Sequence, residues 1–284
     1  MQQFPHGKLI GEPLTTIVIP VRNQLHFTRR CLESIFKYTP EPVEVMVVDN
    51  GSTDGTREYL QALTGVRVLM NNRNVGFAAA CNRGLAVARG EYLLLLNNDV
   101  LVTPGWLTGL ISHLKKYPCA GLVGPLSNCG GLMQTIPVVL PSLNQLDEFT
   151  RRLAVENFGQ CRQVNILSGF CLLIRRQVLN TIGGLDTRFG PGNFEDDDFC
   201  LRARLAGFKL LVAEDVFVYH FGQRTFLGEG MDYRTLMKAN WERFRVKWNL
   251  PADFPPEQRH TSPLILNQPF DPDRHVIPLR ATIC

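Results

Sequence analysis

Short β-branched and aliphatic runs alternate with helix-like segments through the first hundred residues. The runs expected to form strands are residues 15–20, 43–48, 66–70 and 92–96. The segments expected to form helices include residues 24–38 and 76–89. This alternation predicts a parallel sheet with crossover helices, and the uninterrupted YLLLL at 92–96 is typical of a strand covered on both faces. We therefore expect an α/β fold with a mostly parallel central sheet flanked by helices.

The second half of the chain has a less regular pattern. It predicts helices at 106–116, 144–157, 177–182, 195–206 and 231–248, and strands at 119–124, 170–174, 210–212 and 216–219. From Leu250 onward prolines recur, which predicts an extended tail that wraps the body or contacts a partner chain in a homo-oligomer. Trp241, Phe244 and Trp248 recur at helical spacing, which favours a packing face over a platform for sugar stacking.

Composition excludes several classes of protein. The chain has 284 residues, 45% of them hydrophobic and 20% charged, which excludes disorder as its main state. Its net charge of +4 is too small to indicate a nucleic-acid partner. We expect neither a secreted precursor nor a membrane span, because no apolar run approaches the roughly 20 residues that a span needs. The eight cysteines form no CxxC pair, so we expect reduced thiols in a cytoplasmic protein, with peripheral binding at the inner membrane face left open.

Polar residues follow three of the predicted strands at the point where each strand ends. Asp49 ends the second strand, the loop 72–74 follows the third, and Asp99 follows the fourth. In open α/β sheets, ligands bind outside the carboxyl ends of the strands. The sequence therefore predicts that these polar ends converge on one crevice, and that this crevice is the binding site.

Four consecutive acids, residues 195–198, open one of the predicted helices. At 100° per residue they nearly encircle the helix, so all four cannot face one site. Acids in a first turn also stabilise a helix through its dipole, by about 0.3–1 kcal/mol each, and Asn193 is a candidate cap. A purely structural explanation of this cluster is therefore available beside a catalytic one.

Seven strings follow one another in order between residues 14 and 225. They are TTIVIPVRN, VVDNGSTDGT, NRNVGFAAACNRG, LLLLNNDV, SGFCLLIRR, GLDTRFGPGNFEDDDFCLR and VYHFG. This ordered set resembles the successive motifs of family 2 glycosyltransferases with the GT-A fold, and NND resembles their rhamnosyltransferase-like members. The resemblance implies a Rossmann-like nucleotide-sugar transferase fold. Its implied parts are an N-terminal extension (1–13), a nucleotide-sugar-binding half (14–124), an acceptor-binding and catalytic half (125–249) and a proline-rich tail (250–284).

The resemblance implies a donor site at the strand ends. It assigns Asp49 to the nucleobase of the donor, because a carboxylate can accept a hydrogen bond from the imide N–H of uracil or thymine. It assigns Asn74 and Arg83 to the rest of the nucleotide pocket; their structural alternatives are a turn residue and a solvated helix face. The other residues that it places on the donor are Pro20, Arg22, Ser52, Gly76, Asn97, Asn98 and Asp99.

The NND string occupies the DxD position of the family, with Asn97 in place of the first acid and Asp99 retained. The resemblance implies a divalent cation, Mn²⁺ or Mg²⁺, that is bound by Asp99 and His220 and offsets charge on the leaving diphosphate. One carboxylate instead of two implies weaker metal binding. The structural alternatives are a turn at Asn98 and Asp99 and a packing role for His220. Arg224 is either a phosphate partner or a solvated loop charge.

An inverting transferase also needs a carboxylate base that takes the proton of the acceptor hydroxyl. The resemblance places this base in the acid cluster: Asp196 is expected, and Asp197 and Asp198 are the alternatives. It places Glu195 and Gly169 on the acceptor side.

The expected function is inverting, metal-dependent transfer of a sugar from a nucleotide-diphosphate donor to a hydroxyl group. A UDP-sugar is the first expected donor and dTDP-rhamnose the second, and the acceptor is a glycan, a lipid-linked glycan or a protein. One alternative is a catalytically degenerate module that binds nucleotide sugar or glycan, suggested by the acid lost at Asn97. The other is a sugar-phosphate nucleotidyltransferase, which is disfavoured because the first loop, VRNQLHF, has no glycine.

Overall fold

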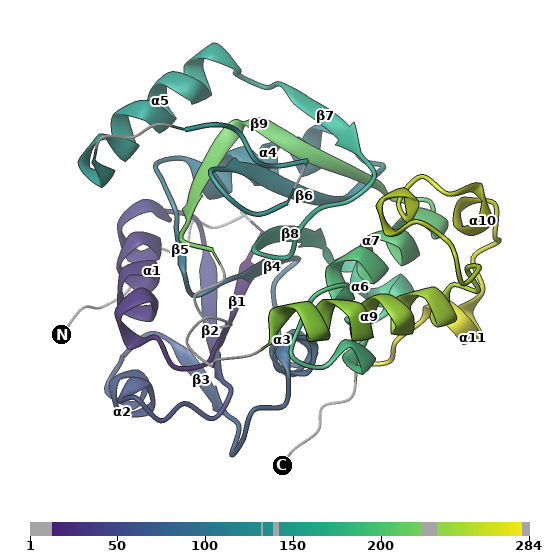
Figure 1. Cartoon of the computed structure of the whole chain (residues 1–284). Helices are drawn as coiled ribbons and strands as arrows, with labels where there is room; N and C mark the ends of the chain where they lie inside the picture. The colour runs from purple at the N-terminus through teal and green to yellow at the C-terminus, as the bar shows by residue number, and fades with distance from the viewer. Residues whose placement is uncertain (1–12, 132, 139–141, 223–231, 280–284) are drawn as a thin grey trace.

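The computed structural model describes residues 13–131, 133–138, 142–222 and 232–279 (Figure 1). The described residues form a nine-stranded sheet of order β3-β2-β1-β4-β8-β6-β9-β5, with β7 paired to β9. Its first part consists of β1 (Thr15–Val21), β2 (Val43–Asp49), β3 (Arg67–Met70) and β4 (Tyr92–Leu96). These four strands are parallel, since β1 pairs with both β2 and β4 and β2 pairs with β3. The α/β fold with a mostly parallel sheet in this half is confirmed.

The second part of the sheet mixes strand directions. Its strands are β5 (Val100–Leu101), β6 (Ala120–Ser127), β7 (Cys161–Val164), β8 (Cys171–Arg175) and β9 (Lys209–His220). Strand β8 lies antiparallel between β4 and β6, whereas β6 and β9 are parallel.

Strand β9 differs from its prediction as two strands. The polar pair Glu214 and Asp215 interrupts the apolar pattern without ending the strand. Along β6 the pairing steps from Pro125 with Ala213 directly to Leu126 with Phe217, so the intervening residues of β9 lie in a bulge. The bulge keeps the strand continuous and delivers its last residue, His220, to the end of the sheet.

Helices cover both faces of the sheet. They are α1 (Leu25–Tyr38), α2 (Thr56–Gln61), α3 (Phe77–Ala86), α4 (Trp106–Lys116), α5 (Leu146–Glu156), α6 (Arg176–Ile182), α7 (Glu195–Leu205), α9 (Tyr233–Lys247), α10 (Pro263–Leu266) and α11 (Pro272–His275). Alternation along β1 shows the two faces, because Ile17 and Ile19 join the core that contains α1 and α4, whereas Val18 joins the core that contains α3, α6 and α7. Figure 1 shows α1 and α3 on opposite sides of β1. No helix in the described ranges is both long and apolar enough to cross a membrane.

The C-terminal segment forms a third core with α7 and α9. Phe244 and Trp248 of α9 are buried in it, which confirms the packing role predicted for the aromatic stripe. The tail packs Ile265 into the same core, so it wraps the body, but its prediction as extended chain is wrong in part. Pro263 and Pro272 each start a short helix, with the side chains of Ser262 and Asp271 as caps.

Candidate active site

One cavity of about 650 Å³ opens where the strand ends meet α7 and the C-terminal segment. Residues named from the sequence that line it are Pro20, Arg22, Asn74, Asn97, Asn98, Asp99, Gly169, Glu195, Asp196, Asp197 and His220. The remaining named residues, Asp49, Ser52, Gly76, Arg83 and Asp198, lie outside its lining. Arg224 falls outside the described residues.

Asp99 and His220 face each other in this cavity. His220 ends β9, whose pairing with β5 sets it opposite Val100, and its Nε2 lies 3.1 Å from Asp99 Oδ1. The other ring nitrogen, Nδ1, lies 3.0 Å from the carbonyl oxygen of Cys129. Because a carbonyl oxygen only accepts, Nδ1 carries a proton, and a neutral His220 turns the lone pair of Nε2 toward the carboxylate.

That arrangement fits a divalent cation. Two lone pairs that face each other repel, and either protonation of the imidazole or a cation between them removes the repulsion. Asn97 adds a buried Oδ1 atom that has no hydrogen-bond partner among the described residues. Carboxylate, amide oxygen and imidazole are ligands that Mn²⁺ accepts. Among the described residues, no group of three or more His, Cys, Asp or Glu side chains lies where it could hold a metal ion, so the protein ligands available here are Asp99, His220 and the amide oxygen of Asn97.

The NND segment is held in place from two sides. The backbone N–H of Asn97 donates to the carbonyl of Phe170 over 2.8 Å, and the side-chain amide of Asn98 donates to Thr28 Oγ1 over 2.9 Å. The Phe170 ring stacks on the His220 ring with centroids 5.0 Å apart. These contacts fix Asp99 and His220 relative to the sheet.

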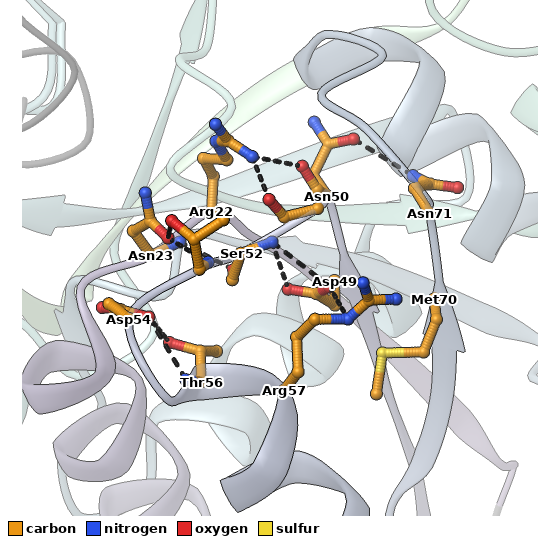
Figure 2. A network of polar contacts seen from close by, with 12 residues as sticks. Arg22, Asn23, Asp49, Asn50, Ser52, Asp54, Thr56, Arg57, Met70 and Asn71 are labelled. Atoms are coloured by element: carbon orange, nitrogen blue, oxygen red, sulfur yellow. Dashed lines mark hydrogen bonds and ion pairs between the residues drawn. The ribbon is translucent and has the colours of Figure 1, made fainter.

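Asp49 does not line the cavity. Figure 2 shows its side chain beside Ser52 and Arg57. Asp49 is fully buried, its carboxylate accepts from the backbone N–H of Ser52 over 3.2 Å, and Arg57 Nε lies 3.3 Å from its Oδ2. Ser52 in turn accepts from the backbone N–H of Asn23 through its hydroxyl oxygen. The carboxylate is thus already paired and holds the shape of the turn after β2.

Asn50, which sequence reasoning missed, lines the cavity in place of Asp49. Its Nδ2 donates to Asn74 Oδ1 over 2.9 Å, and its Oδ1 accepts from the backbone N–H of Val75 over 3.0 Å and from Asn71. Arg22 donates to the carbonyl oxygens of Asn50 and Gly51 (Figure 2). The available signal was strand alternation, because adjacent side chains at a strand end point to opposite faces.

Gly76 and Arg83 support the same loop from outside the cavity. Gly76 has φ +90°, and a Cβ there would lie 2.3 Å from the carbonyl oxygen of Gly190, so only glycine fits. Arg83 donates to the carbonyl of Met70 over 2.7 Å and to Asn71 Oδ1, which braces the end of β3. The solvated helix face considered for Arg83 is therefore not what the structure shows.

The acids that open α7 lie in different surroundings. Asp196 accepts from the backbone N–H of Gly169 over 3.0 Å and of Asp197 over 2.9 Å, and it lines the cavity. Burial, together with the charge of Asp197, raises the pKa of Asp196 to about 6. Burial and the charge of Asp196 hold the pKa of Glu195 well above its usual range, and Glu195 Oε2 has no hydrogen-bond partner among the described residues.

Asp198 belongs to a buried ionic network. It is fully buried between Arg202 Nε at 2.8 Å and Lys247 Nζ at 2.6 Å, and Lys247 also lies 2.7 Å from Asp186. Asp186 is also paired with Arg188, whose Nε lies 2.8 Å from its Oδ2, so two carboxylates meet three cations in this network. Asp198 therefore ties α7 to α9 and does not reach the cavity.

The chain enters α7 through two strained residues. Asn193 and Phe194 have φ values of +72° and +76°, in the left-handed region that non-glycine residues rarely adopt. The buried amide of Asn240 donates to the carbonyls of Phe189, Gly192 and Asn193, which holds this turn in place. Strain of this kind is typical of sites where side chains must be aimed, here the start of α7 at the cavity.

Three comparisons with known proteins bear on this site. A sequence model described as glycosyl transferase family 2 matches residues 16–183. The chain is 32% identical over 224 residues to the uncharacterized protein y4gI of Sinorhizobium fredii, covering 74% of this chain but only 24% of that protein. It is 30% identical over 222 residues to N-acetylglucosaminyl-diphospho-decaprenol L-rhamnosyltransferase of Mycobacterium tuberculosis, covering 67% of this chain and 70% of the relative.

A solved structure shows the same architecture. The mannosyltransferase PcManGT from Pyrobaculum calidifontis, in complex with GDP-Man and Mn²⁺, superposes with a TM-score of 0.59 at 19% identity over 89% of this chain and 70% of that chain. At this identity the likeness shows the fold, which is the GT-A fold expected from the sequence.

Proposed function

Because the chain belongs to glycosyl transferase family 2, we propose that it moves a sugar from a nucleotide-diphosphate donor to an acceptor hydroxyl with inversion at the anomeric carbon. The observation that carries the proposal is one cavity lined both by the Asp99–His220 pair and by Asp196. A UDP-sugar is the first proposed donor and dTDP-rhamnose the second. The name of the mycobacterial relative, a rhamnosyltransferase, supports rhamnose as the sugar of the second donor. The acceptor is a glycan, a lipid-linked glycan or a protein.

The donor diphosphate is proposed to bind at the NND end of the cavity. Asp99, His220 and Asn97 would hold a divalent cation, Mn²⁺ or Mg²⁺, and the Mn²⁺ complex of PcManGT supports this class of ion. When bound, such a cation supplies positive charge that stabilises the diphosphate as a leaving group. Asn74 is the proposed contact to the nucleobase; Asn50 holds it in place through the hydrogen bond from its Nδ2, and Asp49 shapes the preceding turn.

Asp196 is the proposed catalytic base. One of its carboxylate oxygens takes the proton of the acceptor hydroxyl while the hydroxyl oxygen bonds to the anomeric carbon and the bond to the diphosphate breaks. The electron pair of that bond leaves with the diphosphate. With a pKa of about 6, Asp196 is ionised at pH 7 and is a stronger base than an ordinary aspartate, so it can accept the proton of the acceptor hydroxyl. A single displacement of this kind inverts the anomeric configuration.

Glu195 is the proposed acceptor contact. Burial and neighbouring acids raise its pKa well above the usual range, which favours the protonated carboxyl group, a form that can donate a hydrogen bond. The unpartnered Oε2 is the atom available to a sugar hydroxyl. Gly169 donates its backbone N–H to Asp196 Oδ2 and so positions the proposed base next to Glu195.

Calorimetric titration tests the donor site first. UDP, dTDP and GDP are titrated into the protein with and without Mn²⁺, and binding of one diphosphate that Mn²⁺ strengthens is the expected result. Asp99→Asn is expected to lose the enhancement by Mn²⁺. Glu156→Gln, which changes an exposed acid on α5, is the matched control and is expected to keep it. Binding of a diphosphate sugar with neither transfer nor slow hydrolysis would instead support the degenerate binding module.

A further inference from the structure

The C-terminal segment contributes charged side chains to the cavity. Glu257, Arg259, His260 and Thr261 line it, although they lie about seventy residues or more beyond the matched family region, 16–183. Glu257 lies in a short 3₁₀ turn, Pro256–Gln258, and the other three residues follow it. All four precede α10, whose Ile265 is fully buried in the third core. The segment is thereby anchored on both α9 and α7.

Two of these side chains bind the carboxylate next to the proposed base. Arg259 Nε lies 3.1 Å from Asp197 Oδ2, and His260 Nε2 lies 3.0 Å from Asp197 Oδ1. Asp197 has a side chain that is only 7% exposed, so these two partners replace the water that an ionised carboxylate needs. Burial acts to raise the pKa of Asp197, but the close approach of His260 and the charge of Arg259 hold that pKa below its usual range.

The contact is held by further bonds. Arg259 also donates from Nη1 to the carbonyl of Pro256 over 2.8 Å, and its guanidinium lies 5.2 Å from the centre of the Phe194 ring. The carbonyl of His260 accepts from Arg204, near the far end of α7, over 2.7 Å. The segment therefore clamps both ends of the helix that carries the acids.

We propose that Arg259 and His260 are positioning residues of the active site, which keep Asp197 ionised and so leave Asp196 as the single proton acceptor. This inference rests on the proposed function for its catalytic meaning, but its physical content concerns two adjacent carboxylates. Without the clamp, no countercharge fixes the ionisation of either of the two adjacent carboxylates, so the proton acceptor is no longer defined. With the clamp, the negative charge of Asp197 is fixed and, of the two carboxylates, Asp196 is the one that titrates near pH 6.

Other titratable groups lie around this pair. They are Glu195 and Asp198 on α7, Tyr233 on α9, Glu257 and His260 on the tail, and Cys200 and Arg204 beneath the acids. Burial raises the pKa of the Cys200 thiol and that of Tyr233, so neither ionises near pH 6. Burial also raises the pKa of Glu195, and Asp198 is paired with Lys247 and Arg202.

The test is a carbon-13 NMR titration of the aspartate carboxyl carbons in the full chain, which needs no substrate. Loss of the cation in Arg259→Gln is expected to move the titration of the Asp196–Asp197 pair upward by about one pH unit, and Arg259→Lys is expected to restore it. Asp197→Asn has the opposite expected sign, a downward shift for Asp196, because a negative charge is removed. If Arg259 and Asp197 only stabilised the fold, the two variants would not shift the carboxyl titration in opposite directions.

His260→Gln provides a second variant that removes the other partner, so the test does not depend on Arg259→Gln folding. Unchanged titration midpoints in both variants overturn the proposal. If sugar transfer is measured, the acid limb of kcat/KM is expected to move with the titration. A shifted titration in these variants, with no sugar transfer by the wild type, would support the role of Arg259 and His260 and reject the proposed function. Sugar transfer by the wild type, with an unshifted titration in the variants, would support the proposed function and reject the role of Arg259 and His260.

Discussion

His220 presents Nε2 to Asp99 Oδ1 at 3.1 Å while its Nδ1 donates to the carbonyl of Cys129 at 3.0 Å. The second bond decides the chemistry of the first, because it fixes which ring nitrogen carries the proton. The imidazole Nε2 and the carboxylate oxygen that face each other here are the pair that we propose as ligands of a divalent cation. The predictions below start from this pair and move outward to the acids and the loops.

Asp99→Asn is expected to weaken binding of the preferred nucleoside diphosphate in Mn²⁺ by about 10- to 100-fold, the value of a lost charge-assisted contact. The amide keeps the size of the side chain but removes its charge. Calorimetry with and without Mn²⁺ measures the effect, and the enhancement by Mn²⁺ is expected to disappear in the variant. A chelator added to the wild type should reproduce the same weakened affinity.

Asp196→Asn is expected to lower kcat by about 10²- to 10⁴-fold while leaving donor affinity unchanged, because a general base contributes to the chemical step. Asp253→Asn, at an exposed aspartate outside the cavity lining, is the matched control and is expected to retain full activity. Full transferase activity in Asp196→Asn would show that the base assignment is wrong.

The pH profile of the wild type follows from the same carboxylate. Burial raises the pKa of Asp196 to about 6, so kcat/KM is expected to fall about tenfold per pH unit below that value as the base becomes protonated.

The raised pKa also means that the ionised form of Asp196 destabilises the folded state. The variant Asp196→Asn is therefore expected to be more stable than the wild type at pH 7, by about 1–2 kcal/mol. That advantage fades between pH 6 and the unfolded-state value of about 4, where both chains are neutral at this position. Urea unfolding across this range measures it.

Lys247→Met is expected to destabilise the fold by about 3–5 kcal/mol, because it leaves Asp186 and Asp198 buried with one cation fewer. Burial acts to raise the pKa of Asp186, but the charge of Lys247 holds it below the usual value. The stability from this pair is therefore present above about pH 4 and is lost as the pH falls through the folded-state pKa. Lys238→Met, an exposed lysine of the same helix, is the control and is expected to change stability little.

Gly76→Ala is expected to cost more than backbone strain alone. Gly76 and Gly207 share a φ of +90°, but a Cβ at Gly207 meets nothing within 4 Å, whereas one at Gly76 meets the carbonyl of Gly190 at 2.3 Å. Gly207→Ala should therefore cost about 1 kcal/mol and Gly76→Ala clearly more, with loss of diphosphate binding because the loop is displaced. Equal unfolding free energies for the two variants would contradict the proposed contact.

The sequence predicted the parallel strands and the residues at their ends because apolar periodicity and turn residues are local signals. It did not predict which of two neighbours at a strand end faces the ligand. Asp49 was the expected donor contact, but its side chain turns inward to Ser52 and Arg57 while Asn50 lines the cavity. A shift of one residue exchanges the two faces of a strand, and a single sequence does not fix that choice.

The tail was beyond prediction for a different reason. The contact between Arg259 and Asp197 joins residues 62 positions apart, and no local pattern marks either one as the partner of the other. Prolines correctly indicated breaks in long helices, but the short capped turns at Pro263 and Pro272 depend on packing against α7 and α9. Long-range contacts of this kind become visible only in the folded chain.

The clamp on Asp197 makes the cavity depend on two distant stretches of the chain. Asp196 and Asp197 open α7, whereas Arg259 and His260 come from the segment that packs on α7 and α9. Undocking of that segment takes away one wall of the cavity and both partners of Asp197 while every sheet strand stays in place. The integrity of the proposed active site therefore reports whether the segment is docked.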